Sequence, residues 1–317
     1  MQHSTFARSH LPGQISNPKP LDPPSEDSWN IIRSFLQQFD TTNLPSVEDA
    51  ALEDLCLKEG ERRGYDLDVL KPALTVGLNI ASAAYHHLSN DKVKVFIVFY
   101  TAFVTYFDDA YPDDPDALVG VPNFTKHFAA SEKQSTKMLN DLANLLAETS
   151  QLFGQVSADF IVHAGLKFIA VLVLETQNKY ESMHRVDRYA LYLREMSGLG
   201  EAYAMFIFPA ELQYNTYVQA LPLLRDFIDF TNDITSFYKE ECEGETHNLV
   251  SFLAEARGEP KSKALYYLVE KCMEAHERIL LILSPHKEAQ GMYKEFVKGF
   301  LSFHLGGKRY RLGELNL

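Results

Sequence analysis

Cysteine is scarce in this sequence, and so are the other signs of a secreted or membrane protein. Only three cysteines are present, Cys56, Cys242 and Cys272, with no CxxC pair among them. An odd, scattered set indicates neither a disulfide framework nor a zinc knuckle, and it fits a reducing compartment. No run of 18 or more apolar residues occurs, and the first residues, MQHSTFARSHLPGQ, lack an apolar signal core. We therefore expect a cytoplasmic protein without stable membrane insertion.

Positive charge is also in short supply. The 317 residues include 30 Lys and Arg against 43 Asp and Glu, which gives a net charge of −13. Because such a protein repels nucleic-acid phosphates, we expect no nucleic-acid partner. The sequence also lacks an HExxH zinc site, a GxxxxGK(S/T) phosphate loop and a nucleophile elbow. A small anionic ligand can bind such a chain only where cations are gathered locally.

Strand-like alternation is scarce, whereas helical periodicity covers most of the chain. Residues 1–27 carry five prolines among polar residues and are typical of a flexible N-terminal tail. Ser46-Val47-Glu48-Asp49 resembles a capping box at the start of a helix. Further helices are predicted over residues 67–88, 93–107, 133–153, 155–184, 187–206, 219–241, 261–283 and 287–305. With no internal repeat, residues 28–317 are expected to form one all-α domain.

An acidic cluster follows the apolar segment YTAFVTYF. It reads DDAYPDDPD from Asp108 to Asp116, and Pro112 should end the preceding helix. Carboxylates at a helix C-terminus meet the negative end of the helix dipole and repel one another, a cost that a divalent cation would offset. Charge runs of this kind are more often solvated loops. The position after such an apolar run nevertheless favours an interior-facing Asp108 or Asp109.

A second group of oxygen donors is predicted on the helix LPLLRDFIDFTNDITSFYKEE. Asn232, Ser236 and Glu240 are four residues apart, so their side chains stack on one helical face. Amide, hydroxyl and carboxylate oxygens are hard donors that suit Mg²⁺. The alternative is a polar stripe on a surface helix, although Asn and Ser are mediocre helix formers. Lys239 lies beside this face and could reach a phosphate group.

Two arginines could supply positive charge. Arg194 stands just before a Ser-Gly break in YLREMSG, and Arg309 with Tyr310 follows the amphipathic run FLSFHL. A guanidinium offers planar, multidentate donors to phosphate oxygens. Either arginine alone would be an ordinary surface residue. Together with the two groups of oxygen donors, they predict a site that binds a diphosphate through Mg²⁺.

These motifs resemble those of the fungal class I sesquiterpene cyclases of the trichodiene synthase type. The likeness is carried by NDITSFYKE, LREMSGLG, FHLGGKRYRLGEL and DDAYPDDP, and it extends from about residue 90 to residue 314. The resemblance implies a single-domain helical bundle around a central apolar active-site cavity. It also implies an Mg²⁺-dependent enzyme that ionises farnesyl diphosphate and cyclises the carbocation to a sesquiterpene hydrocarbon or alcohol. The product itself is left open.

The resemblance also implies a metal site. It suggests three Mg²⁺ ions, with Asp108 as the ligand from the first motif and Asn232, Ser236 and Glu240 as ligands from the second. The first motif departs from the family pattern, because an extra residue moves its third acid to Asp113. Whether Asp113 is a ligand is therefore left open.

The diphosphate group has its own implied partners. The resemblance assigns Arg194, Lys239, Arg309 and Tyr310 to diphosphate binding, with Arg309 and Tyr310 also counted as catalytic. It further implies that Asp109 pairs with Arg309 when the site closes.

Aromatic residues are expected beside the reacting hydrocarbon, because aromatic faces stabilise carbocations. Tyr100, eight residues before Asp108, is predicted to contact the substrate, and Phe103, Phe300 and Phe303 are further candidates. Most aromatic residues at helical spacing simply pack in a core.

Two other functions are compatible with parts of this pattern. A chain-elongating prenyl diphosphate synthase would be expected to carry a second DDxxD motif where this chain has Asn, Ser and Glu. A non-catalytic helical protein that binds an apolar ligand would not need the Asn232 face or Mg²⁺. A homodimer is compatible with the sequence, which leaves the oligomeric state open.

Overall fold

The computed structural model describes residues 26–110, 116, 118–177 and 186–315, and within these ranges the regular elements are all helical. The α-helices are α1 (Glu26–Leu36), α2 (Ala50–Arg63), α3 (Leu67–Ala83), α4 (Asp91–Ala110), α5 (Phe124–Ala129), α6 (Lys137–Ala147), α7 (Thr149–Leu152), α8 (Gln155–Gln177), α9 (Asp187–Ser197), α10 (Gly200–Phe206), α11 (Leu221–Glu243), α12 (Leu249–Arg257), α13 (Lys261–Leu283) and α14 (Lys287–Gly306). Short 3₁₀ helices are η1 (Val121–Asn123), η2 (Tyr214–Thr216), η3 (Val218–Ala220), η4 (Lys308–Tyr310) and η5 (Leu312–Leu315). The expected all-α architecture is confirmed.

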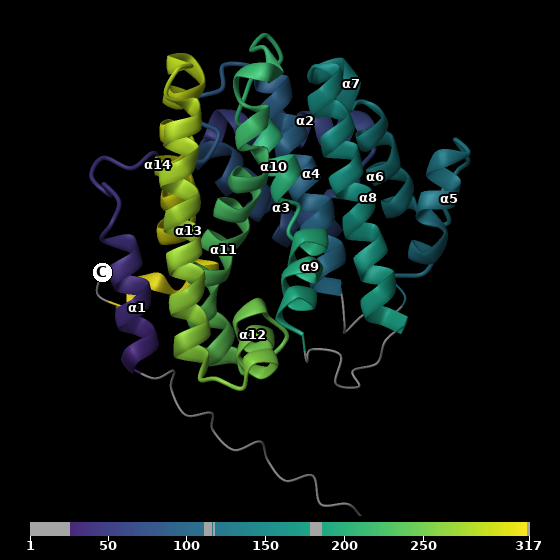
Figure 1. The fold of residues 1–317 in the computed structure, drawn as a ribbon. Helices are drawn as coiled ribbons and strands as arrows, with labels where there is room; N and C mark the ends of the chain where they lie inside the picture. Colours follow the sequence, from purple (N-terminus) through teal and green to yellow (C-terminus); the bar gives the residue numbers. More distant parts are fainter. Residues whose placement is uncertain (1–25, 111–115, 117, 178–185, 316–317) are drawn as a thin grey trace, which may run out of the picture.

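Helix α4 lies at the centre of the bundle (Figure 1). Every residue from Val95 to Val104 is buried, as expected for a helix that is apolar on all sides. Helix α3 packs closely along it, because Gly77 lies against the backbone carbonyl of Val98 with no room for a side chain. Helix α11 packs against α10 and α13. This packing brings the ends of α4 and α11, which carry the two predicted motifs, into one bundle.

Helix ends differ from the sequence expectation in several places. Asp49, not Ser46, caps α2, since its carboxylate accepts the amides of Ala51 and Leu52. The Ser46 hydroxyl instead accepts the amide of Glu48, so the predicted capping box is wrong. The helix predicted over 133–153 is divided into α6 and α7, and the one over 187–206 into α9 and α10. The short helices α5 and α12 were not predicted.

Three other expectations concern the whole chain. The predicted tail falls almost entirely on residues 1–25, which lie outside the described part of the chain, and α1 begins at Glu26. The three cysteines are free, as expected. One segment, Gln155–Glu175 of α8, is long and apolar enough to cross a membrane, but half of its window is buried inside the protein. Because core helices share this composition, the segment is weak evidence for a membrane span.

Candidate active site

A cavity of about 570 Å³ brings the predicted motifs together. This volume lies in the usual range for small-ligand sites. Much of its wall is apolar and comes from Val76, Ile80, Val104, Phe168, Val171, Leu172, Leu199, Ile228, Phe300 and Phe303. The predicted site residues that line it are Asp108, Asp109, Arg194, Asn232, Ser236, Lys239, Glu240, Arg309 and Tyr310. Asp113 lies outside the described residues. The cavity is therefore apolar over one part and charged over another.

One side of helix α4 borders the cavity. It lines the cavity with Thr101, Val104, Thr105, Asp108 and Asp109. Tyr100 is fully buried and does not line this cavity, so the cavity gives its predicted contact with the substrate no support. Eight residues of α-helix overshoot two turns by about 80°, so Tyr100 and Asp108 do not share a face. Phe103 is buried away from the cavity as well, whereas the predicted Phe300 and Phe303 do line it.

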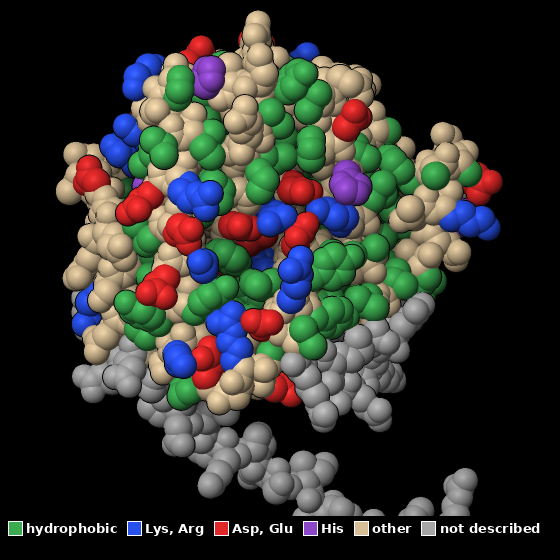
Figure 2. Space-filling view, in the orientation of Figure 1, with side chains coloured by type: hydrophobic (Ala, Val, Ile, Leu, Met, Phe, Trp, Pro, Cys, Tyr) green, Lys and Arg blue, Asp and Glu red, His purple; other side chains and the backbone are tan. Residues whose placement is uncertain are grey.

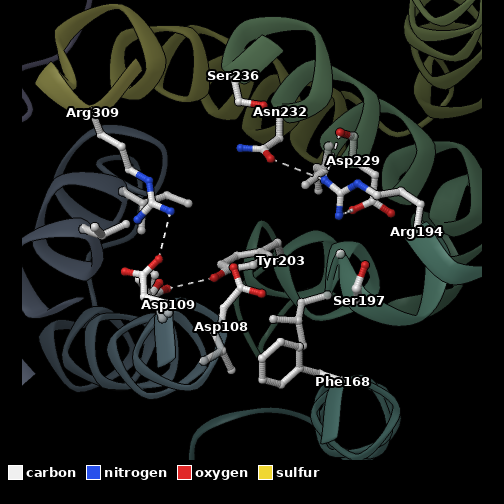
Figure 3. A pocket seen from close by; sticks show the side chains of 18 of the residues that line it. Asp108, Asp109, Phe168, Arg194, Ser197, Tyr203, Asp229, Asn232, Ser236 and Arg309 are labelled. Atoms are coloured by element: carbon white, nitrogen blue, oxygen red, sulfur yellow. Dashed lines mark hydrogen bonds and ion pairs between the residues drawn. The ribbon is translucent and has the colours of Figure 1, made fainter. Parts of the chain in front are cut away.

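Tyr203 on α10 is a cavity residue that sequence reasoning missed. Its hydroxyl donates a hydrogen bond to Oγ1 of Thr101 at 3.1 Å, which places a polar group within the largely apolar wall (Figure 3). Burial raises the pKa of this phenol, so Tyr203 stays protonated. The segment GEAYAMF gave no signal of this role, because the side chain reaches the cavity only through the packing of α10 on α8 and α11. Glu175 and Ser197 line the cavity and were also missed.

The acidic pair ends α4 at the cavity, as predicted. Asp108 contacts the solvent inside the cavity, yet the surrounding protein and the neighbouring charge of Asp109 raise its pKa to about 6. Asp109 accepts a hydrogen bond from Nη2 of Arg309 at 3.2 Å. The predicted pairing of these two residues is therefore present. It joins the end of α4 to η4, 200 residues later in the chain.

The Asn232 face lies across the cavity from the acidic pair. In Figure 3, Asn232 and Ser236 on α11 point toward the space that Asp108 and Asp109 border from the other side. Glu240, one turn beyond Ser236, completes the set. Burial raises the pKa of Glu240 to about 7, with Glu245 and Asp233 adding repulsion that the Ser236 hydroxyl partly offsets. On both sides of the cavity, burial therefore disfavours the charged form of a carboxylate more than the nearby cations favour it.

This donor set fits a hard cation better than a preformed metal cluster. Among the described residues, no three His, Cys, Asp or Glu side chains form a metal-binding group. The donors that do converge are the amide, hydroxyl and carboxylate oxygens of Asn232, Ser236 and Glu240, with Asp108 opposite. Mg²⁺ accepts such oxygens and commonly completes its coordination with water and substrate phosphates. The residues present therefore suit Mg²⁺ bound together with a phosphorylated ligand.

Arg194 is held at the cavity by acids on α11. Its Nε contacts both carboxylate oxygens of Asp233, at 2.7 and 2.9 Å, and its Nη1 lies 3.7 Å from Asp229. The Ser-Gly break ends α9 as predicted, and Gly198 leaves the room that Arg194 and Asp229 occupy. The following residue, Leu199, has a φ of 56°, a left-handed conformation that costs a non-glycine residue about 1 kcal/mol or more.

Lys239 also lines the cavity, and its ammonium is paired with acids. Its ammonium lies 3.1 Å from Glu243 and 3.5 Å from Glu245. Figure 2 shows acidic and basic side chains interspersed over the middle of the face that α9, α11 and α12 form. Arg194, Lys239 and Arg309 thus bring positive charge to a cavity whose lining also carries several acidic side chains.

The comparisons with known proteins agree with this geometry. The profile of the trichodiene synthase (TRI5) family matches residues 73–316. Alpha-cuprenene synthase COP6 from Coprinopsis cinerea is 33% identical over 305 residues, 93% of each chain. Terpene synthase BipA from Cochliobolus sativus is 30% identical over 83% of this chain and 82% of its own. The crystal structure of linalool/nerolidol synthase from Streptomyces clavuligerus, in complex with 2-fluorogeranyl diphosphate, is 15% identical and superposes with a TM-score of 0.64. The match covers 86% of this chain and 99% of that one.

Proposed function

The chain belongs to the trichodiene synthase (TRI5) family, and from this premise we propose that it is a sesquiterpene cyclase acting on farnesyl diphosphate. The relatives named above are terpene synthases, and the shared fold is that of helical terpene synthases. The observation that carries the proposal is the arrangement of the cavity. Oxygen donors on α4 and α11 face each other across a cavity whose wall is partly apolar and also carries cationic side chains.

The polar part of this cavity is proposed to bind the diphosphate with Mg²⁺. Asp108 on one side and Asn232, Ser236 and Glu240 on the other would hold the metal, and three ions remain the number that the family resemblance implies. Bound Mg²⁺ neutralises charge on the leaving diphosphate and so favours heterolysis of the allylic carbon–oxygen bond. The raised pKa values of Asp108 and Glu240 support this assignment, since burial disfavours both charged carboxylates more than the nearby Arg309, Arg194 and Lys239 favour them.

Four side chains are proposed to hold the diphosphate oxygens. Arg194, Arg309 and Tyr310 donate from α9 and η4, and Lys239 donates from α11. Arg194 must exchange part of its contact with Asp233 for the phosphate oxygens, which its five N–H donors allow. Arg309 is also paired with Asp109, so an anion bound at Arg309 would lie where the C-terminal segment meets α4.

The apolar part is proposed to fold the prenyl chain and exclude water. Water would trap a carbocation, so a dry, shaped wall is a requirement for cyclisation. The aromatic rings of Phe168, Tyr203, Phe300 and Phe303 border this space. Their faces can stabilise positive charge on the hydrocarbon. A cytoplasmic location is proposed as well, because the three free cysteines suit a reducing compartment.

A chain-elongating synthase is the nearest alternative. The α11 motif argues against it, because Asn232 and Ser236 stand where a second Asp-rich motif would be expected to place acids. The test is product analysis by gas chromatography after incubation with geranyl, farnesyl or geranylgeranyl diphosphate and Mg²⁺. A cyclic sesquiterpene from farnesyl diphosphate alone supports the proposal. A longer prenyl diphosphate, formed when isopentenyl diphosphate is added, would refute it.

A further inference from the structure

His304 is a buried histidine directly behind the Asn232 face. It lies in the last turn of α14, has no exposed surface and does not line the cavity. Its ring packs against Phe300 and Tyr310, with centroids 4.5 and 4.6 Å away. An apolar side chain would fill this space without burying polar atoms that need hydrogen bonds. The presence of an imidazole here therefore suggests that its ring nitrogens have a role.

The hydrogen bonds of His304 fix its tautomer. Nδ1 lies 2.7 Å from the backbone carbonyl oxygen of Phe300, which can only accept, so Nδ1 carries the proton. The ring has no exposed surface, and burial favours the neutral form of an imidazole. Nε2 is left with a lone pair, which makes it an acceptor.

That acceptor meets the side-chain amide of Asn232. Nδ2 of Asn232 lies 3.4 Å from Nε2 of His304 and 3.3 Å from the hydroxyl of Tyr310. On its other side, Oδ1 of Asn232 faces Nη2 of Arg194 at 3.4 Å (Figure 3). A guanidinium can only donate, and the bare Nε2 can only accept, so both neighbours require the same orientation of the amide. The oxygen of Asn232 is thereby directed toward Arg194 and the cavity.

We propose that His304 is a positioning residue that orients the Asn232 amide, so that its oxygen faces the cavity as a ligand for Mg²⁺–diphosphate. The inference rests on the proposed function. His304 acts through Asn232 and not on the substrate, since Asn232 and Tyr310 lie between its ring and the cavity. Residues that orient metal ligands in this way typically contribute 10- to 100-fold to metal affinity or activity.

The same contacts connect Asn232 to the C-terminal segment. Tyr310 packs beside His304 and accepts from Asn232, and the preceding residue, Arg309, reaches Asp109 on α4. His304 therefore supports both a proposed metal ligand and the segment that carries the proposed diphosphate donors. Loss of the imidazole should disturb ligand binding more than it disturbs folding.

The test compares three single variants of the full chain. His304→Phe keeps an aromatic ring but removes the acceptor, and His304→Gln retains a side-chain acceptor. The control is His276→Phe, which removes a partly buried histidine whose Nδ1 contacts the hydroxyl of Tyr293 and not Asn232. Thermal unfolding establishes that each variant is folded.

Two measurements decide the outcome. Nitrogen-15 NMR of labelled histidine in the ligand-free protein should show His304 protonated on Nδ1 alone, with its signals identified by their absence in His304→Gln. Calorimetric titration with Mg²⁺ and inorganic diphosphate should show affinity about tenfold or more weaker in His304→Phe, largely restored in His304→Gln and unchanged in His276→Phe. Proton occupancy on Nε2, or equal losses in His304→Phe and His276→Phe, would overturn the inference. A wild-type protein that binds no Mg²⁺–diphosphate would instead refute the proposed function, and the inference about His304, which rests on that function, would be refuted as well.

Discussion

Gly198 offers a sharp test of how Arg194 is held. Its backbone, with φ −73° and ψ −15°, is right-handed helical, so alanine is allowed there. A Cβ at this position would nevertheless overlap Nη1 of Arg194 and Oδ1 of Asp229, and it would lie 2.7 Å from Cγ of Asp229. In Gly198→Ala the backbone can therefore keep its conformation, but the new methyl group takes the space that Arg194 and Asp229 occupy.

The expected change in the free energy of unfolding is the difference between two opposing effects. Alanine in helical conformation gains about 0.5–1 kcal/mol over glycine, whereas overpacking costs about 1–3 kcal/mol. Because the buried Asp229 and Arg194 must both shift, we expect a net loss of about 1–2 kcal/mol. For a chain of 317 residues, that corresponds to a decrease in Tm of about 1.5–3 °C. A displacement of the guanidinium by about 1 Å should lower diphosphate release by up to about 100-fold.

The matched control is Gly291→Ala on α14, where an added Cβ would meet nothing within 4 Å. It should raise stability by about 0.5–1 kcal/mol and leave turnover unchanged. Differential scanning calorimetry and a coupled assay for released diphosphate measure both quantities. If Gly198→Ala behaved like Gly291→Ala in both assays, the space beside Gly198 would not be what positions Arg194, and the reasoning would be refuted.

Three further predictions concern packing, the C-terminal pair and pH. Gly77→Ala should lower the free energy of unfolding by about 3 kcal/mol in urea titrations, because the added Cβ would overlap the backbone carbonyl of Val98 on the packed neighbouring helix. A loss below about 1 kcal/mol would contradict this close packing. Arg309→Gln should change the free energy of unfolding by less than about 1 kcal/mol, because the ion pair with Asp109 is solvent-exposed. The same variant should strongly lower diphosphate release, and unchanged turnover would exclude Arg309 from the site. Burial raises the pKa of Asp229 to about 7, so this side chain contributes stability below about pH 4 that is lost as the pH rises through about 7. Asp229→Asn should therefore gain stability relative to wild type over that window in urea titrations, and a pH-independent difference would refute the raised pKa.

The sequence predicted those features of the site that depend on local periodicity. The spacing of Asn232, Ser236 and Glu240 determines their shared helical face, and the structure places all three on the cavity. The apolar run before Asp108 similarly identified the acidic end of α4. The Ser-Gly break after Arg194 was also found from sequence, because such residues interrupt helical patterns.

Features that depend on tertiary packing could not be found in this way. Tyr203 reaches the cavity from a helix whose sequence resembles ordinary core, and Tyr100 is turned away by the rotation of α4. The contact of Arg194 with Asp233 joins residues 39 positions apart, so no local pattern reveals it. His304 shows the same limit: as a single histidine in FLSFHL it carries no signal, and only its contact with Asn232 gives it a role.

The central claim is that the faces of α4 and α11 form one Mg²⁺-dependent ionisation site. The most direct measurement is diphosphate release from farnesyl diphosphate, followed across a range of Mg²⁺ concentrations, by the wild-type protein and by the Asn232→Leu/Ser236→Leu double variant. We expect release by the wild type that requires Mg²⁺, and none by a double variant that remains helical by circular dichroism. Unaltered turnover in the double variant, or wild-type turnover that persists in the presence of a chelator, would contradict the claim.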